Sequence, residues 1–431
     1  MSSEAINPDL IDVRKLMQEV SVEELCRTAE EFFAQRADWD SLQAKPFADI
    51  DEMPELLICF AQVVRGLNLL PDMTILDFGA GTCWTSRFLS QLGLKVIALD
   101  VSTSALKIGK KLYRRHPVFG RQPQPQFLQF NGYTFDLPDQ SVDRISCWEA
   151  FHHVPNPAQV IKEMGRVLKQ GGIAGFSEPG PQHSKTAQAQ CEMRTYRTFE
   201  NDIDVREIWN EAQKAGFTDI KLPLVNTKPS FLPLCEFEKF LSGESGDAYA
   251  ADTRNQMQER RLFFLIKGES MDAPDSRERA ALKADLQVTP SSNHVVAGKP
   301  IHLTITVQNT GDAVWLPTPE IPQPWWKKGV LARFGKQTNM GPDVVAPRVG
   351  GVRFAIQLLD ENSNLLDIDY FRFHLTPGDG RPIQPGETIE LQVKVPMPPA
   401  GMYLLECNLV SEGVCWFDCG GAPVRLPIKV I

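Results

Sequence analysis

The sequence predicts an α/β fold with a doubly wound, mostly parallel sheet, followed by a separate all-β domain. Between residues 73 and 180, short apolar runs alternate with longer amphipathic segments, which is typical of parallel strands joined by helices. A glycine-containing turn follows the first apolar run directly. Beyond residue 285, alternating polar and apolar runs are separated by proline and glycine turns, which is typical of antiparallel strands.

Residues 1–70 are expected to form a helical cap ahead of the first strand. Ser21 and Glu24 have the spacing of a capping box, which satisfies free backbone N–H groups at a helix N-terminus. Apolar residues then recur at the spacing of an amphipathic helix: Val22, Leu25, Ala29, Phe32 and Phe33.

Residues 71–268 are expected to form the α/β domain. Its strands are predicted at residues 74–78, 95–100, 126–130, 143–148 and 173–177, and its helices at 83–92, 102–115 and 158–168. We expect Gly171 and Gly172 to end the last of these helices. The polar residues 269–284 are expected to be a linker, and residues 285–431 to form an antiparallel β-sandwich.

The charge balance and the hydropathy exclude some classes of protein. The chain has 45 basic and 54 acidic residues, a formal net charge of −9. This balance disfavours nucleic acid as a partner, because binding to phosphate backbones depends on clustered Lys and Arg. We also expect no membrane span and no signal peptide, because the sequence contains neither a long enough apolar run nor a basic and apolar N-terminus. The sequence therefore predicts a cytoplasmic protein.

Three of the nine cysteines, Cys407, Cys415 and Cys419, lie close together near the C-terminus. Their spacing does not form the paired Cys-x-x-Cys motifs of structural zinc sites. We expect them to be reduced, small and buried, and we predict no metal site in this chain.

The segment Asp77-Phe-Gly79-Ala80-Gly81 joins a predicted strand to a predicted helix. Glycines permit a tight turn and let the backbone approach a ligand, and the helix that follows presents free N–H groups. Asp100 follows Gly81 by 19 residues, at the end of the next strand. A carboxylate in that position can bind both hydroxyls of a ribose. The pattern therefore predicts a cofactor that contains a nucleoside.

Two residues separate the possible cofactors. Dinucleotide-binding turns have a third glycine three residues after the second, and that position is Trp84. Asp77 stands just before the turn, where a carboxylate would repel a pyrophosphate but suits a ligand with a sulfonium and an amino group. S-adenosylmethionine is therefore favoured, with a nicotinamide oxidoreductase as the weaker alternative.

These motifs resemble the class I S-adenosylmethionine-dependent methyltransferase domain of the bacterial small-molecule type. The resemblance covers residues 73 to about 180, and the usual third glycine of its first motif is Cys83 here. Its acidic second motif is matched by Asp100, and its third motif by Asn131-Gly132, with an amide in place of the usual carboxylate. The resemblance implies a Rossmann-like fold with S-adenosylmethionine as cofactor. It implies cofactor contacts from Asp77, Gly79, Ala80, Gly81, Asp100, Val101, Asn131, Gly132 and Phe135.

Candidates for the chemistry follow the next two predicted strands. Methyl transfer requires in-line approach and sometimes a base for the acceptor proton. His152 and His153 come directly after a strand end, where they can act as a base, bind the acceptor or have a structural role. Glu178 and His183 follow the next strand and are also expected at this edge, with helix capping as the alternative for Glu178. The acidic residues 200–204 can bind a cation or start a helix.

The C-terminal region contains no catalytic constellation. It resembles immunoglobulin-like sandwich domains attached to proteins that modify or export polysaccharides, through features such as residues 307–315 and 409–417. Tryptophans can stack on sugar rings. We expect Trp315 and Trp416 in the core, and Trp325 and Trp326 in a loop where they can be exposed.

The sequence therefore predicts methyl transfer from S-adenosylmethionine to a small-molecule or glycan acceptor. From the C-terminal resemblance, we expect a hydroxyl of a sugar or polysaccharide precursor, with His152 or His153 as base and carbohydrate contact through the sandwich. The alternative is a carbohydrate-binding or scaffold protein whose cofactor domain does not catalyse a reaction.

Overall fold

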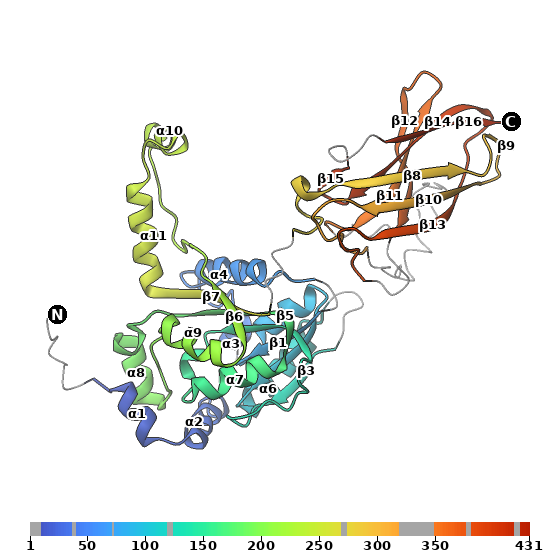
Figure 1. The fold of residues 1–431 in the computed structure, drawn as a ribbon. Coiled ribbons are helices and arrows are strands. Elements are labelled where there is room, and N and C mark those ends of the chain that lie inside the picture. The colour runs from blue at the N-terminus through green and yellow to red at the C-terminus, as the bar shows by residue number, and fades with distance from the viewer. Residues whose placement is uncertain are drawn as a thin grey trace. The chain divides into compact units, whose positions relative to one another are not determined.

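The computed structural model describes residues 10–36, 40–70, 73–118, 124–268, 274–318, 349–375, 381–417 and 423–431. The chain divides into two compact units, residues 1–270 and residues 271–431 (Figure 1). Within the described ranges, no helix combines the length and the apolar character needed to cross a membrane.

The first unit is built on a seven-stranded sheet with the strand order β3-β2-β1-β4-β5-β7-β6. The strands are β1 (Thr74–Phe78), β2 (Lys95–Asp100), β3 (Gln126–Gln129), β4 (Val142–Trp148), β5 (Leu168–Pro179), β6 (Phe217–Lys221) and β7 (Arg260–Lys267). Strands β1 to β5 pair in parallel, and β7 is antiparallel to both β5 and β6. The carboxyl ends of β1, β2, β4 and β5 therefore meet at one edge, where ligands bind in open α/β sheets.

Helices cover both faces of this sheet. They include α4 (Met53–Gly66), α5 (Trp84–Gln91), α6 (Thr103–Arg115), α7 (Pro157–Val167) and α9 (Val205–Lys214). One apolar cluster joins side chains of α4 and α5 to β1 and β2, and a second joins α7 and α9 to β1, β4 and β5. Strands buried on both faces read as continuous apolar runs, which explains why they are visible in the sequence.

The structure corrects one predicted boundary. Strand β5 was expected at residues 173–177 after a glycine stop, but it begins at Leu168, directly after α7, and the glycines lie inside it. The pairing with β4 jumps from Val142–Leu168 to Arg144–Ile173. Residues 169–172 are therefore looped out of register, and Gly171 supplies the positive φ of +73° that this irregularity requires.

The N-terminal cap consists of α1 (Val13–Glu19), α2 (Val22–Ala34) and α3 (Asp40–Ala44), followed by α4. Ser21 caps α2 by accepting a hydrogen bond from the backbone N–H of Glu24 at 3.2 Å. Glu30 of α2 accepts hydrogen bonds from Ser102 and from both the hydroxyl and the backbone N–H of Ser104, at the start of α6. This carboxylate anchors the cap beside the carboxyl end of β2.

Later elements were not predicted from the sequence. The 3₁₀ turn η1 (Phe151–His153) follows β4, and the turn η2 (His183–Lys185) and α8 (Ala187–Tyr196) follow β5. Helices α10 (Leu234–Ser242) and α11 (Asp247–Glu259) are inserted between β6 and β7 and extend away from the sheet (Figure 1).

The second unit contains two β-sheets, ordered β13-β10-β8 and β12-β11-β14-β16-β9. Its strands are β8 (Ala284–Pro290), β9 (His294–Val295), β10 (Ile301–Asn309), β11 (Val352–Asp360), β12 (Leu365–His374), β13 (Thr388–Val395), β14 (Gly401–Ser411), β15 (Cys415–Trp416) and β16 (Val424–Val430). Pairing is antiparallel except between β16 and β9. Buried side chains from both sheets form one apolar cluster. The immunoglobulin-like character stays a prediction.

Residues 274–284 are not a free linker. Ser276 is fully buried, and its hydroxyl donates a hydrogen bond to the carbonyl of Gly350 in the second unit. Trp315 is fully buried, as expected, and Trp416 is partly buried with the guanidinium of Arg372 over its ring. Trp325, Trp326 and Cys419 lie outside the described residues.

Candidate active site

The glycine loop between β1 and α5 is held in a conformation that few residues adopt. Gly79 and Gly81 have φ values of +67° and +49°. The backbone N–H groups of Gly79 and Ala80 donate hydrogen bonds to the carbonyl of Leu99, at 2.8 and 3.0 Å. These bonds fold the loop against the end of β2 and bring it next to Asp100.

The residue that replaces the usual third glycine still adopts a backbone conformation typical of glycine. Cys83 has a φ of +64°, in the left-handed region that glycine normally occupies. The thiol fits there because α6 has a glycine opposite. A Cβ atom on Gly109 would lie 2.4 Å from the Cys83 sulfur.

Asp100 is positioned by this loop. Its Oδ2 accepts a hydrogen bond from the backbone N–H of Gly81 at 2.7 Å, and its Oδ1 accepts one from Ser102 at 2.8 Å. Burial raises the pKa of the Asp100 carboxyl to about 6, although these two hydrogen bonds counteract the shift. Each oxygen keeps a further lone pair for a ligand hydroxyl.

Asp77 does not reach the ligand space. Its Oδ2 accepts hydrogen bonds from the hydroxyls of Thr85 and Ser86, at 2.8 and 2.5 Å, and only 1% of the residue is exposed. Asp77 lies outside the cavity lining, and its expected contact with a cationic ligand stays a prediction. Asp77 joins the end of β1 to the first turn of α5. This role of Asp77 could have been inferred from the sequence, because Thr85 and Ser86 place hydroxyl groups in that first turn.

A cavity of about 290 Å³ opens beside the glycine loop. The expected cofactor residues Gly79, Ala80, Gly81, Asp100, Val101 and Gly132 line it. Asn131 and Phe135 do not. The Oδ1 of Asn131 closes a turn by accepting hydrogen bonds from two backbone N–H groups, and the Phe135 ring packs in the core against Phe78 and Phe130.

The rest of the cavity lining is predominantly apolar. It is formed by the cap, by the loop that follows α8, and by Trp84 of α5 and Trp148 of β4, so it joins segments far apart in the sequence. Its apolar lining residues include Val22, Leu25, Phe32, Phe33, Leu42, Leu56, Trp84, Trp148 and Phe199. Lys45, Glu149 and Glu192 supply charge, and Arg260 is ion-paired with Glu149.

His153 is the imidazole that lines this cavity. Its Nδ1–H donates a hydrogen bond to the carbonyl of Phe199 at 2.6 Å, which fixes the tautomer of the neutral ring. The Nε2 then carries a lone pair, and the described residues offer it no hydrogen-bond partner. Partial desolvation beside the cavity lowers the pKa of His153, whose side chain is 42% exposed, and the neighbouring His152 lowers it further.

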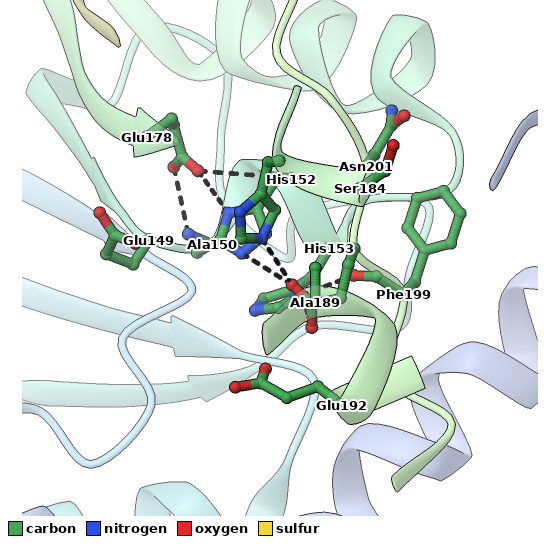
Figure 2. A network of polar contacts seen from close by, with 12 residues as sticks. Glu149, Ala150, His152, His153, Glu178, Ser184, Ala189, Glu192, Phe199 and Asn201 are labelled. Carbon is green, nitrogen blue, oxygen red and sulfur yellow. Dashed lines mark hydrogen bonds and ion pairs between the residues drawn. The ribbon is translucent and has the colours of Figure 1, made fainter. Parts of the chain in front are cut away.

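His152 lies behind the cavity wall in a network of imidazoles and carboxylates (Figure 2). Its Nδ1 lies 2.7 Å from Glu178 Oε2, and its Nε2 lies 3.5 Å from Glu200 Oε2. Burial opposes protonation of this ring, but contacts with both carboxylates outweigh it and raise the pKa of His152 to about 10. His183 Nε2 lies 3.0 Å from the same oxygen of Glu200.

The structure places the four candidates for catalysis differently. His152, Glu178 and His183 do not line the cavity, and His153 does. Glu178 is fully buried and accepts hydrogen bonds from the backbone N–H groups of Ala150 and Phe151, so it caps η1. This is the capping alternative left open by the sequence.

Glu200 is the buried residue whose place the sequence did not reveal. It is 1% exposed, whereas Asp204, four residues later, caps α9 by accepting hydrogen bonds from the N–H groups of Arg206 and Glu207. The acidic run thus does start a helix, but its first member turns inward to the histidines. Acidic residues are common at a helix N-terminus, so the sequence did not distinguish the buried Glu200 from the capping Asp204.

A test of the loop geometry uses two glycine substitutions. In Gly79→Ala, the new methyl group meets the Cβ of Ala150 at 2.2 Å, and the positive φ adds strain of about 1–2 kcal/mol. Gly216→Ala has the same backbone strain, with φ +89°, but nothing within 4 Å of the added Cβ. We expect thermal unfolding to show a larger loss of Tm for Gly79→Ala. Equal losses would contradict the close approach of the loop and η1.

Comparisons with known proteins agree with this geometry. Residues 76–176 match a family model described as a methyltransferase domain. The demethylmenaquinone methyltransferase of Renibacterium salmoninarum is 30% identical over 142 residues, which make up 32% of this chain and 56% of that protein. The ubiquinone biosynthesis O-methyltransferase of Nitrosomonas europaea is 30% identical over 140 residues, with the same coverage of both chains. The chain thus spans about half the length of these curated relatives.

A similar solved structure is that of phosphoethanolamine N-methyltransferase 2 of Haemonchus contortus in complex with S-adenosyl-L-methionine. It is 14% identical, covers 55% of this chain and 61% of that chain, and has a TM-score of 0.35.

The family match covers the strand, the glycine loop, Asp100 and both histidines that follow β4. Residues 76–176 thus form a class I S-adenosylmethionine-dependent methyltransferase domain, with S-adenosylmethionine as its cofactor.

Proposed function

We propose that the protein transfers the methyl group of S-adenosylmethionine to a hydroxyl of an apolar, ring-containing small molecule. The observation that carries this proposal is the composition of the cavity lining. The lining combines the glycine loop and Asp100 with aromatic side chains of the cap and the imidazole of His153.

The cofactor half of the cavity suits a nucleoside joined to a sulfonium. Gly79 and Gly81 line the cavity and have no side chains of their own, so the methionine part can lie against their backbone. The ribose hydroxyls can donate to the remaining lone pairs of Asp100. The adenine would lie near Val101 and Gly132, whose φ of +89° brings the backbone close to the cavity.

The acceptor half favours an apolar ring over a sugar. Recognition of a sugar usually needs several polar side chains for its hydroxyls, whereas Phe32, Phe33, Leu42 and Phe199 line this wall. Aromatic side chains bury large apolar area and stack on flat rings. Two relatives that share this domain are named for demethylmenaquinone methylation and for ubiquinone biosynthesis, which is consistent with a ring-shaped acceptor.

In this proposal His153 acts as the general base. Its Nδ1–H is held by the carbonyl of Phe199, so Nε2 can take the proton of a hydroxyl while oxygen attacks the methyl carbon. A phenolic hydroxyl, with a pKa near ~10, gives up its proton to an imidazole far more readily than an alcohol does. Phenols are therefore the favoured acceptors.

The experiment is an acceptor screen with the full chain and S-adenosylmethionine, with formation of S-adenosylhomocysteine as readout. Apolar dihydroxybenzenes should be turned over, and sugar nucleotides should not. Turnover of sugars alone would overturn the apolar acceptor and restore the sugar hydroxyl predicted from the sequence. Cofactor binding without turnover of either class would favour the alternative of a non-catalytic binding protein.

Cofactor affinity should depend on pH through Asp100. The carboxyl is ionised above its pKa of about 6, and the ribose hydroxyls need the ionised form. We expect affinity to be constant above pH 7 and to fall as the pH drops through 6, by up to about tenfold per unit. The neighbouring carboxyls are Glu30, on α2, and Asp77.

Titration calorimetry of S-adenosylhomocysteine between pH 5 and 8 measures this dependence. Asp100→Asn is the control, because it removes the proposed group and leaves Glu30 and Asp77 in place. An unchanged pH profile in that variant would assign the effect to another carboxyl.

A further inference from the structure

Three imidazoles surround one buried carboxylate behind the cavity wall. The Oε2 of Glu200 lies 3.0 Å from His183 Nε2 and 3.5 Å from His152 Nε2, and its Oε1 lies 3.5 Å from His153 Nδ1. Ligand atoms of His152, His153 and Glu200 all lie within 4.8 Å of one another.

Two carboxylates are buried in this cluster. Glu178 and Glu200 are both almost fully buried, at 0% and 1% exposure. A buried carboxylate is costly unless its oxygens are hydrogen-bonded or bound to a cation. The Oε1 of Glu200 has no hydrogen-bond partner. A divalent cation beside Glu200 would give this oxygen a partner.

The surroundings of His152 are those of a metal ligand. In metal sites a ligating histidine commonly gives its other ring N–H to a carboxylate, which fixes the tautomer and the ring orientation. Glu178 accepts from His152 Nδ1 at 2.7 Å and is itself fixed by backbone N–H groups of η1. In the neutral ring that metal binding requires, Nε2 would carry the lone pair, and it lies 3.5 Å from Glu200 Oε2.

We propose that His152, His183 and Glu200 bind a divalent transition-metal ion of the zinc class. Two imidazoles and a carboxylate are a common ligand set for such ions. Ligand atoms at tetrahedral positions around zinc lie roughly 3.3 Å apart, close to the 3.0 and 3.5 Å that separate Glu200 Oε2 from the Nε2 atoms of His183 and His152. His153 is left out of the set, because its Nδ1 is bound to Phe199. At least one coordination position remains for water.

The ion would join three separate segments. His152 belongs to η1 after β4, His183 to η2 after β5, and Glu200 to the loop between α8 and α9. That loop carries Thr198 and Phe199 of the cavity wall. The ion would thus fix the wall around His153, and its binding does not depend on which acceptor the protein methylates.

The experiment measures zinc itself. The full chain is stripped with a chelator, and Zn²⁺ is titrated back by calorimetry with elemental analysis of the dialysed product. We expect one Zn²⁺ per chain, with at least tenfold weaker binding in His183→Gln and Glu200→Gln. His116→Gln, on an exposed turn after α6, is the matched control and should bind as the wild type does.

Cobalt substitution separates this site from the cysteines. Nitrogen and oxygen ligands give visible Co²⁺ bands without the near-ultraviolet absorption of thiolate coordination, and His183→Gln should lose those bands. Circular dichroism checks that the variants fold. His183 is the histidine chosen for substitution because its side chain is the more exposed of the two histidine ligands, at 19% against 5% for His152. The proposal is overturned if less than one tenth of the chains bind Zn²⁺, if the variants bind as tightly as the wild type, or if cobalt reports thiolates.

Discussion

Asp100→Asn is expected to weaken binding of S-adenosylmethionine by about 100-fold or more. The ionised carboxylate would accept two ribose hydroxyls, and hydrogen bonds to a charged acceptor contribute about 1.5–3 kcal/mol each, roughly twice the neutral value. In the wild type, the carboxylate accepts hydrogen bonds from the backbone N–H groups of Gly81 and Ser102. An asparagine has only one acceptor oxygen, so its NH₂ group would face one of these two donors. A loss of about 3 kcal/mol corresponds to a factor of about 100 in Kd.

Titration calorimetry with S-adenosylhomocysteine measures this loss directly. Asp136→Asn makes the same chemical change at an exposed position outside the cavity lining, and it should bind the cofactor as the wild type does. If Asp100→Asn retains wild-type affinity, the ribose is held elsewhere, and the orientation proposed for the cofactor is wrong.

The cofactor half of the site could be predicted because its residues lie on consecutive elements. A parallel strand, a glycine turn and the next strand end are close in sequence, and the sheet brings Gly79, Gly81 and Asp100 to one edge. The helix caps follow the same local logic, since Ser21 and Ser102 lie one residue before their helices. Local chemistry therefore determines both features.

Asp77 and Asn131 show where this local logic fails. Both belong to motifs that point to the cofactor, yet each side chain is used by its own neighbourhood. The hydroxyls of Thr85 and Ser86 bind Asp77, and the N–H groups of Tyr133 and Thr134 bind Asn131. A short polar side chain can satisfy a nearby backbone or hydroxyl group as readily as a ligand. Spacing alone does not distinguish the two.

The acceptor half could not be predicted, because it is assembled from distant segments. Phe33 on α2, Leu56 on α4 and Phe199 after α8 meet only in the folded chain. The same holds for His152, His183 and Glu200, whose positions in the sequence have no metal-binding spacing. The proposed ion reverses the sequence-based expectation that the chain has no metal site, because ligands from three loops leave no local pattern.

Within the predicted pair of histidines, the structure separates two roles that the sequence left together. Consecutive residues of a tight turn direct their side chains differently, so His153 lines the cavity while His152 is buried between Glu178 and Glu200. A base must be within reach of the acceptor proton, and the geometry of the turn therefore favours His153. This assignment leads to the second large effect.

His153→Gln is expected to reduce kcat by a factor of about 10² to 10⁴, the range for removing a general base. The glutamine amide can still donate a hydrogen bond to the carbonyl of Phe199, so the wall should keep its shape. Its oxygen is far less basic than an imidazole nitrogen, so the acceptor proton has no comparable destination. The Kd for S-adenosylmethionine should stay within about twofold of the wild type, because His153 makes no proposed contact with the cofactor.

Steady-state formation of S-adenosylhomocysteine, with an acceptor found in the screen, gives kcat and KM, and calorimetry gives the cofactor Kd. His116→Gln is again the control for the same change at a remote position. A purely structural role for His153 would lower Tm and weaken the cofactor together, with little specific loss of kcat. Acceptors with more acidic hydroxyls should recover part of the lost rate in His153→Gln, because they need less help to lose the proton. If the defect is the same for strongly and weakly acidic acceptors, His153 positions the acceptor and does not take its proton.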